Sequence, residues 1–270
     1  MKQEIGYLKI ASSLGLKEDD VVFIASDLTR LAFNCMENGE SFDGNAFIDS
    51  FLTQLPHGSL VIPTYTDDYC DGMTYDVCKS KPTIGALPTV AFNREDGYRT
   101  MDPFHSMKIW GKHISLFKSS TEKSTFGLNS GFGLLHQLNA KMLLIDVTIK
   151  QAFTFVHYTE ESMHVSWREL RKHRITTVDY NGDINEGEFL FFTRKKGIIN
   201  WFFPLQDIFI REGIMEIKTI DEIPIGIVDL PRAHDCMIKD IQDNRGRNTH
   251  KFSTLEWLRL TSKQVLKFIH

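Results

Sequence analysis

The first half of the chain alternates between short apolar runs and apolar residues at helical spacing. Runs at 21–25 and within 56–66 each follow a polar turn, and both predict buried strands, the second ended by Pro63. Between them, one helix face is apolar, formed by Phe47, Ile48, Phe51, Leu52 and Leu55. A looser helical pattern covers 3–15. This strand–helix–strand order is typical of an α/β layer architecture.

Four further segments continue this alternation. The polar stretch 66–83 predicts a loop, and 85–94 predicts a short helix. Residues 141–148 form the clearest later strand pattern, and residues 153–165 behind it predict another helix.

The last third alternates more weakly. Hydrophobic pieces between 190 and 228, separated by short turns, predict antiparallel strands on the same sheet, and 230–243 predicts a terminal helix. No linker, charge run or repeat divides the chain, which indicates one domain over residues 1–270. The expected fold is a three-layer α/β/α arrangement whose mixed central sheet is largely antiparallel toward the C-terminal part.

Composition narrows the function classes. A net charge of −4 and a pI near 6.2 give no basic surface for nucleic acid. No apolar run approaches the length of a membrane span, and charged residues interrupt any signal-peptide core at the N-terminus, so a cytoplasmic protein is expected. The four cysteines lack Cys-x-x-Cys spacing and predict free thiols, with no metal site.

Familiar nucleotide and nucleophile motifs are missing from the sequence. It contains no G-x-x-x-x-G-K-[ST] phosphate loop and no G-x-G-x-x-G after a strand. It also lacks the G-x-S-x-G turn that carries the serine of α/β-hydrolases.

Polar residues follow the first predicted strand directly. Ser26, Asp27, Thr29 and Arg30 offer hydroxyls, backbone N–H groups and a guanidinium, which suit a phosphate at the carboxyl end of a strand. The alternative is that Ser26 and Asp27 only cap the next helix.

An acidic and aromatic loop follows the second strand. Asp67, Asp68 and Asp71 lie beside Tyr65 and Tyr69, a composition that suits a cationic or sugar-like ligand. A solvated turn would have the same composition, and this alternative stays open.

Two histidines have neighbouring residues that are typical of a catalytic site. His157 and Glu160 share one face of a predicted helix, where a carboxylate can orient an imidazole as a general base. His105 follows an Asp-Pro turn and precedes Ser106 at the start of a strand. Such pairs are also common on helix surfaces, and His105 has a purely structural alternative.

Several of these segments resemble, in order, the aminoglycoside 3-N-acetyltransferase family over residues 16–240. The segments that carry the resemblance are "ASDL" (25–28), "GSLVIPTY" (58–65), "GALP" (85–88), "DPFHS" (102–106), "TFGLNS" (125–130), "TFVHYTE" (154–160) and "IREGI" (210–214). The family has a three-layer α/β/α fold and transfers an acyl group from acyl-CoA to a sugar amine. The sequence departs from it at Asp27, Asp102 and Phe104.

The resemblance implies residue roles. It implies catalysis by His157 with Glu160, near His105 and Ser106. It implies acyl-CoA as co-substrate, bound by Ser26, Asp27, Leu28, Thr29, Arg30, Phe126, Gly127 and Ser130. An acceptor site is expected at Thr64, Tyr65, Asp67, Asp68 and Asp102.

Three functions follow as hypotheses. The segment "FTFVHYTEE" is more similar to a branch that acylates dTDP-linked amino sugars for surface glycans. The acidic loop instead favours an aminoglycoside-modifying enzyme, because polycationic drugs need carboxylates and nucleotide phosphates would be repelled. The third hypothesis is a binding protein without catalytic activity. The expected partners are an acyl-CoA and an amino sugar, without nucleic acid or membrane, and a homodimer is one option for the assembly.

Overall fold

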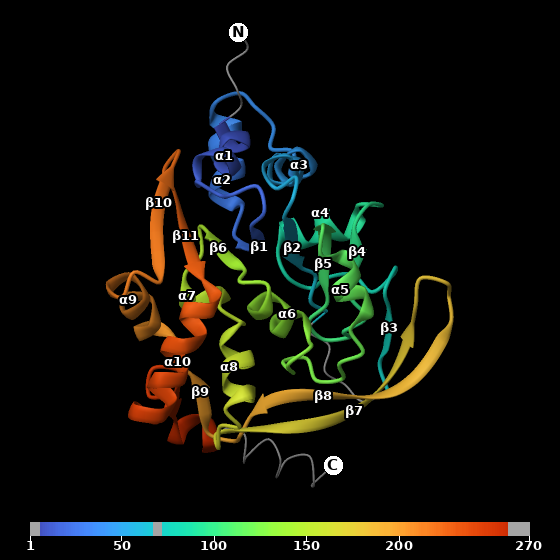
Figure 1. The fold of residues 1–270 in the computed structure, drawn as a ribbon, viewed down its shortest axis with the longest axis vertical. Coiled ribbons are helices and arrows are strands. Elements are labelled where there is room, and N and C mark those ends of the chain that lie inside the picture. The colour runs from blue at the N-terminus through green and yellow to red at the C-terminus, as the bar shows by residue number, and fades with distance from the viewer. Residues whose placement is uncertain (1–5, 67–71, 259–270) are drawn as a thin grey trace.

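The structure is a computed structural model that describes residues 6–66 and 72–258 (Figure 1). Within these ranges no helix combines the length and the apolar character needed to cross a bilayer. Acidic-loop residues 67–71, including Asp67 and Asp68, lie outside the described residues, so the predicted role of that loop stays a prediction.

A seven-stranded mixed sheet forms the centre of the fold. Its strands are β1 (Val21–Ser26), β2 (Ser59–Pro63), β4 (Tyr98–Arg99), β5 (Met107–Gly111), β6 (Lys141–Ile145), β10 (Met215–Ile220) and β11 (Ile223–Asp229). Their order is β10-β11-β6-β1-β2-β5-β4. The pairs β6–β1 and β1–β2 are parallel, and the other pairs are antiparallel.

The parallel strands β6, β1 and β2 occupy the middle of this sheet. Because they point the same way, their carboxyl ends meet at one edge, where Ser26 lies opposite Ile145 and Pro63 ends β2. Strand β5 runs antiparallel and begins beside Pro63, so the residues just before Met107 reach the same edge. Ligands of open α/β sheets collect at such an edge.

One face of the sheet is covered by helices from the first third of the chain. They are the 3₁₀ helix η1 (Gly6–Leu8), α1 (Lys9–Ser13), α2 (Thr29–Glu37), α3 (Gly44–Gln54) and α4 (Ala86–Asn93). Val22 and Ile24 point to this face and pack in one cluster with Phe47 and Phe51. The Asp43 side chain caps α3 by accepting hydrogen bonds from its first backbone N–H groups.

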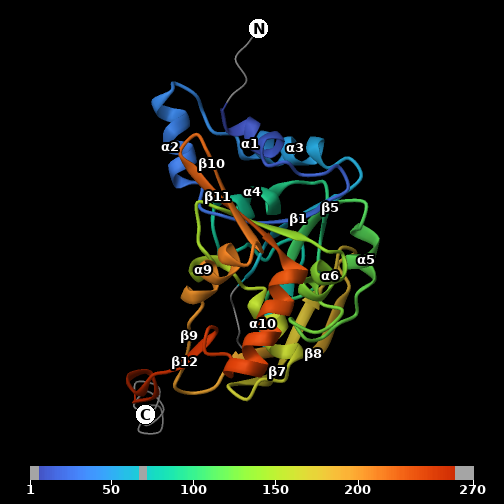
Figure 2. The same ribbon diagram turned by 60° about the vertical axis from the view of Figure 1, so that its left-hand side comes forward.

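Later helices cover the opposite face. They are α5 (Ile114–Ser119), α6 (Gly131–Gln137), α7 (Ile149–Ala152), α8 (Val156–Ser162), α9 (Phe203–Arg211) and α10 (Leu230–Asn244). Val21 and Phe23, the alternate residues of β1, pack on this side. Figure 2 shows the sheet between α1–α3 and the group α6, α9 and α10. The predicted three-layer fold with a mixed sheet is confirmed.

A separate three-stranded sheet lies beyond the central one. It contains β3 (Thr74–Asp76), β7 (Arg168–Val178) and β8 (Ile184–Arg194), and β7–β8 forms a long hairpin arm (Figure 1). The prediction that the hydrophobic pieces between residues 190 and 228 all form strands of one sheet is therefore wrong for β8. Much of β7 is charged and exposed, so this hairpin cannot be buried on both faces; it instead buries Ile175 and Phe189 against Tyr75 and Phe104.

Two other local predictions need correction. The segment 66–83, predicted as a loop, contains the short strand β3, in which the apolar ring of Tyr75 is fully buried. The piece 199–205, predicted as a strand, is split between β9 (Ile198–Asn200), which pairs with β12 (His250–Phe252), and helix α9. Pro204 in the first turn of α9 favours the helix start, and Leu205 and Phe209 then share its buried face.

Candidate active site

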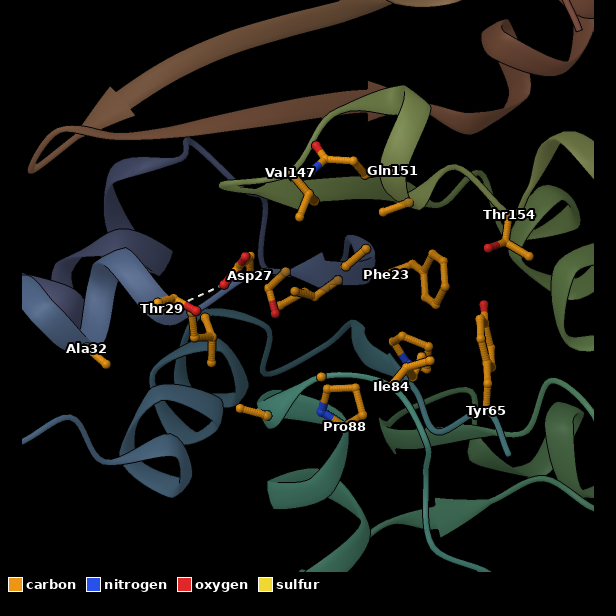
Figure 3. A pocket seen from close by; sticks show the side chains of 18 of the residues that line it. Phe23, Asp27, Thr29, Ala32, Tyr65, Ile84, Pro88, Val147, Gln151 and Thr154 are labelled. Carbon is orange, nitrogen blue, oxygen red and sulfur yellow. Dashed lines mark hydrogen bonds between the residues drawn. The ribbon is translucent and has the colours of Figure 1, made fainter. Parts of the chain in front are cut away.

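A cavity of about 670 Å³ opens at the carboxyl ends of the parallel strands. Its walls come from the β1–α2 turn, the end of β2, the start of α4 and the segment after β6 (Figure 3). Asp27 and Thr29 lie at one end of it, and Tyr65 and Thr154 at the other. The lining is mostly apolar, with few polar groups, as is usual for sites that take an elongated organic ligand.

The β1–α2 turn is held by Asp27 and forms a wall of the cavity. The Asp27 carboxylate accepts a hydrogen bond from the Thr29 backbone N–H at 2.9 Å, which holds the turn before α2, although the N-cap position itself is Leu28 and has no side-chain cap. The Ser26 hydroxyl is buried and has no hydrogen-bond partner within the described part of the chain. Leu28 also lines the cavity. Arg30 is outside the lining and pairs with Asp146 at 2.8 Å.

His105 lies at the same edge because Asp102 shapes the turn before β5. One Asp102 carboxylate oxygen accepts hydrogen bonds from the backbone N–H groups of Phe104 and His105, at 2.8 and 3.0 Å. The His105 ring lines the cavity and packs against Tyr65, with ring centroids 4.4 Å apart. Burial, and to a lesser degree the charge of a protonated His157, lowers the pKa of His105 to about 3, so this imidazole is neutral at pH 7.

Ser106 and Thr64 lie below this cavity rather than in its lining. Both side chains are fully enclosed, and the Ser106 hydroxyl donates a hydrogen bond to the Thr64 carbonyl at 2.7 Å. The buried Arg99 guanidinium donates from Nε to both hydroxyls. The structure therefore places these two residues in a polar network under the site.

Helix α8 carries His157 and Glu160 on one face, as the spacing predicts. His157 Nδ1 lies 2.8 Å from a Glu160 carboxylate oxygen. The Glu160 side chain is fully buried, while the His157 side chain is 13% exposed. An ionised carboxylate only accepts hydrogen bonds, so Nδ1 carries the proton and Nε2 keeps its lone pair.

Glu160 has two further partners that sequence reasoning missed. Arg168 Nε donates to the same oxygen that faces His157, and Trp167 Nε1 donates to the other oxygen at 2.8 Å. Burial opposes ionisation, but the Arg168 charge and these hydrogen bonds hold the pKa of Glu160 at about 2. Burial and the Arg168 charge together lower the pKa of His157 to about 4. No local pattern connects Arg168 to Glu160, because they meet only when β7 crosses the end of α8.

Phe126 joins the two histidines into one site. Its ring lies 5.1 Å from the His105 ring and 5.3 Å from the His157 ring, measured between centroids. Thr154, which precedes α8 in the chain, lines the cavity together with His105. The cavity, His105 and the His157–Glu160 pair therefore form one contiguous region.

The turn that contains Gly127 and Ser130 faces a second cavity, of about 460 Å³. The Ser130 side chain caps α6 and lines this second cavity, whose far wall is the β7–β8 hairpin arm. Asp102, Glu122, Asp179 and Glu186 line it with a single lysine, Lys123. Of the residues expected to bind acyl-CoA, the structure thus gathers Ser26–Thr29 at the first cavity and Ser130 at the second.

Metal-ligating side chains do not converge on this region. Across residues 6–66 and 72–258, no group of three or more His, Cys, Asp or Glu side chains is arranged to hold a metal ion.

Comparisons with known proteins identify relatives of the fold. The family described as aminoglycoside 3-N-acetyltransferase matches residues 24–242. A comparison with curated protein sequences gives no match. The YokD protein from Bacillus subtilis superposes with a TM-score of 0.72 at 16% identity, covering 90% of this chain and 94% of its own. AAC-IIIb in a binary complex with CoASH superposes with a TM-score of 0.72 at 15% sequence identity, and the match covers 92% of this chain and 96% of AAC-IIIb. Sisomicin-bound AAC-VIa superposes with a TM-score of 0.71 at 14% sequence identity, and the match covers 88% of this chain and 97% of AAC-VIa.

Proposed function

Because the chain belongs to the aminoglycoside 3-N-acetyltransferase family, we propose that it transfers an acyl group from acyl-CoA to a primary amine of an amino sugar. The observation that carries this proposal is the hydrogen bond from His157 to the buried Glu160, connected through Phe126 to His105, which lines the cavity at the carboxyl ends of β1, β2 and β6. AAC-IIIb, a structural relative, was solved with CoASH.

The first cavity suits the acyl donor. A pantetheine arm is narrow and largely apolar with two amide groups, and the cavity has mostly apolar walls, with Ser26 and its buried, unpartnered hydroxyl among the lining residues of the described chain. The N-terminus of α2, with its partial positive charge, opens at the same end as Asp27 and Thr29. Thus Ser26–Thr29 are proposed to bind the donor, with its thioester toward His105 and Tyr65.

The reaction proposed for this site is aminolysis of the thioester. The lone pair of the neutral amine nitrogen forms a bond to the carbonyl carbon, the carbon–sulfur bond breaks, and CoA leaves as a thiolate that then takes a proton from the His157 imidazolium, which restores the neutral ring. His157 Nε2 takes the proton that the nitrogen loses, while Glu160 holds the Nδ1–H and stabilises the imidazolium. His105 is proposed to contact the thioester end of the donor, because its ring lines the first cavity.

The second cavity favours a cationic acceptor. Four carboxylate side chains and one lysine line it, so it attracts ammonium groups and repels the phosphates of a nucleotide-linked sugar. AAC-VIa, another structural relative, was solved with the aminoglycoside sisomicin. A polycationic amino sugar is therefore the proposed acceptor, and neither the family match nor these relatives supports a dTDP-linked sugar.

The base is tested by His157→Gln, which keeps the size of the side chain but cannot take the proton. We expect kcat to fall by at least about 100-fold, since general-base help contributes about 10²–10⁴-fold, while the Kd for acetyl-CoA stays nearly unchanged. The matched control is His57→Gln, because the His57 side chain is 72% exposed and remote in the fold. Turnover of the His157 variant within about threefold of wild type would exclude this base.

The acceptor is tested by measuring thiol release from acetyl-CoA and from hydroxyacyl-CoAs against aminoglycosides and dTDP-linked amino sugars. Faster release with the aminoglycosides supports the proposed acceptor. Release only with the nucleotide-linked sugars would overturn it and favour the surface-glycan hypothesis. Donor binding without turnover on any amine would favour the non-catalytic hypothesis.

A further inference from the structure

We propose that Arg168 is a positioning residue that keeps His157 unprotonated by neutralising Glu160 at the same carboxylate oxygen that faces the imidazole. The catalytic role of Arg168 rests on the proposed function. Its effect on the pKa of His157 does not, and it can be measured in the protein without substrate. It extends the histidine–carboxylate pair to a chain of four side chains, in the order His157, Glu160, Arg168 and Asn200.

The Arg168 guanidinium is buried and held in place by hydrogen bonds. Its side chain is 4% exposed, and each guanidinium nitrogen has an acceptor. Nε donates to the Glu160 carboxylate, Nη1 to the Phe192 carbonyl at 3.3 Å, and Nη2 to the Asn200 side-chain oxygen at 2.8 Å. These contacts join α8 to β7, β8 and β9, so the fold of the hairpin arm determines where the guanidinium lies.

The charge balance explains why such a partner is needed. A buried carboxylate beside an imidazole stabilises the imidazolium, and a histidine that is already protonated cannot accept a proton from an amine. Arg168 offsets the Glu160 charge, so the carboxylate still orients Nδ1–H without holding a second proton on the ring. Burial of the ring, which is the larger cause, and this offset together lower the pKa of His157, so His157 stays neutral with the Nε2 lone pair available at the pH of the reaction.

Other charged groups near His157 come from several elements. His105 precedes β5, Glu160 lies on α8 itself, and Arg194 on β8 adds a weaker positive influence. Phe126 and Phe202 supply apolar contacts to the ring. Arg168 is the cation among these groups that contacts the Glu160 carboxylate directly.

The test is an NMR titration of the His157 ring in the full-length protein without ligand. We expect a wild-type pKa well below 6.5, and a rise of at least about one unit in Arg168→Met, since a nearby charge moves a pKa by about 1–3 units. In Arg168→Lys the pKa of His157 should stay near the wild-type value. The kcat should fall, because an ammonium group cannot bind Glu160 and Asn200 together. The control Arg171→Met removes an exposed arginine of the same strand, which pairs with Glu169 alone among described acidic residues, and should change neither quantity.

A second variant covers the case in which Arg168→Met does not fold. Asn200→Asp keeps the arginine and its hydrogen bond but adds a negative charge next to Nη2, so the pKa of His157 should rise by a smaller amount. The acid limb of the kcat/KM profile should move with each of these pKa changes. A wild-type His157 pKa near 7, or one that is unchanged in Asn200→Asp and in any folded Arg168→Met, would overturn the inference. A protein that shows the pKa shifts but acylates no amine would instead contradict the proposed function.

Discussion

At the residue scale, the site combines carboxylates whose hydrogen bonds are satisfied with a serine hydroxyl that has no partner among the described residues. Glu160 has three donors on its two oxygens, and Asp102 holds the turn of His105 through two backbone N–H groups. The Ser26 hydroxyl, by contrast, is buried without a partner in the described part of the chain. A buried polar group without a hydrogen bond is destabilising, and because Ser26 lines the first cavity, we expect a bound donor to supply the missing partner.

We therefore expect Ser26→Ala to leave the thermal stability unchanged or slightly higher, because it removes an unsatisfied buried group. The Kd for acetyl-CoA should rise by about 2–10-fold, the typical effect of one lost hydrogen bond. Calorimetry of binding and of unfolding measures both quantities. Ser50→Ala is a matched control, because its hydroxyl already donates to the Phe47 carbonyl away from the cavity. Unchanged donor affinity in Ser26→Ala would show that this hydroxyl does not contact the donor.

At the element scale, α8 is held on two sides by titratable contacts. One face carries His157 and Glu160, and the other packs against a histidine pair from α6 and α10. The Thr159 hydroxyl lies 2.8 Å from His234 Nδ1, Tyr158 bonds His136, and the two histidine rings are 4.3 Å apart. Helix α8, which carries the proposed base, thus packs against two histidines that are neutral at pH 7.

This packing predicts that stability falls on mild acidification. Burial lowers the pKa of His136, and burial together with His136 lowers the pKa of His234 to about 4, against a weaker raising effect of Asp235. Between pH 6.5 and 4 the unfolded chain therefore binds more protons at these sites, so this stabilisation is complete above pH 6.5 and is lost toward pH 4. Each histidine contributes at most about 1.4 kcal/mol per pH unit.

Urea unfolding at pH 7.5 and pH 5 measures this effect. His234→Gln should reduce the difference between the two free energies of unfolding, whereas the exposed His57→Gln should leave it as in wild type. His105 and His157 have lowered pKa values too and account for part of the remaining slope. An equal pH dependence in His234→Gln and wild type would contradict the prediction.

At the scale of the whole molecule, the hairpin arm connects the second sheet to the central one. Tyr180 at the tip of the arm bonds both backbone groups of Arg99: its hydroxyl accepts from the N–H at 2.6 Å and donates to the carbonyl at 3.1 Å. The same arm forms a wall of the acidic cavity and supplies Arg168 to the His157–Glu160 pair. Acceptor binding should therefore depend on the position of the arm.

Tyr180→Phe tests that dependence. We expect the free energy of unfolding to fall by about 1–3 kcal/mol, because the Arg99 backbone N–H loses its acceptor. The KM for the amine should rise, while the KM for acetyl-CoA stays constant, since the first cavity does not include the arm. Ile184→Thr, an exposed position on the same arm, is the control. Equal changes in both KM values would indicate general loosening rather than a role of the arm in acceptor binding.

The sequence by itself determined the parts of this protein that depend on neighbours in the chain. Apolar periodicity predicted β1, β2, β6, α3 and α10, and the three-residue spacing placed His157 and Glu160 on one helix face. These features follow from backbone geometry, which repeats every 3.6 or 2 residues whatever packs against it.

Tertiary structure decided the rest, because contacts between distant segments leave no periodic trace in the chain. The polar hairpin arm forms its own sheet instead of extending the central one, and Ser106 lies under the cavity with Arg99. Most of all, Arg168 at the start of β7 turns back onto Glu160 of helix α8, and a buried charge is balanced only by a partner that the folded chain brings to it.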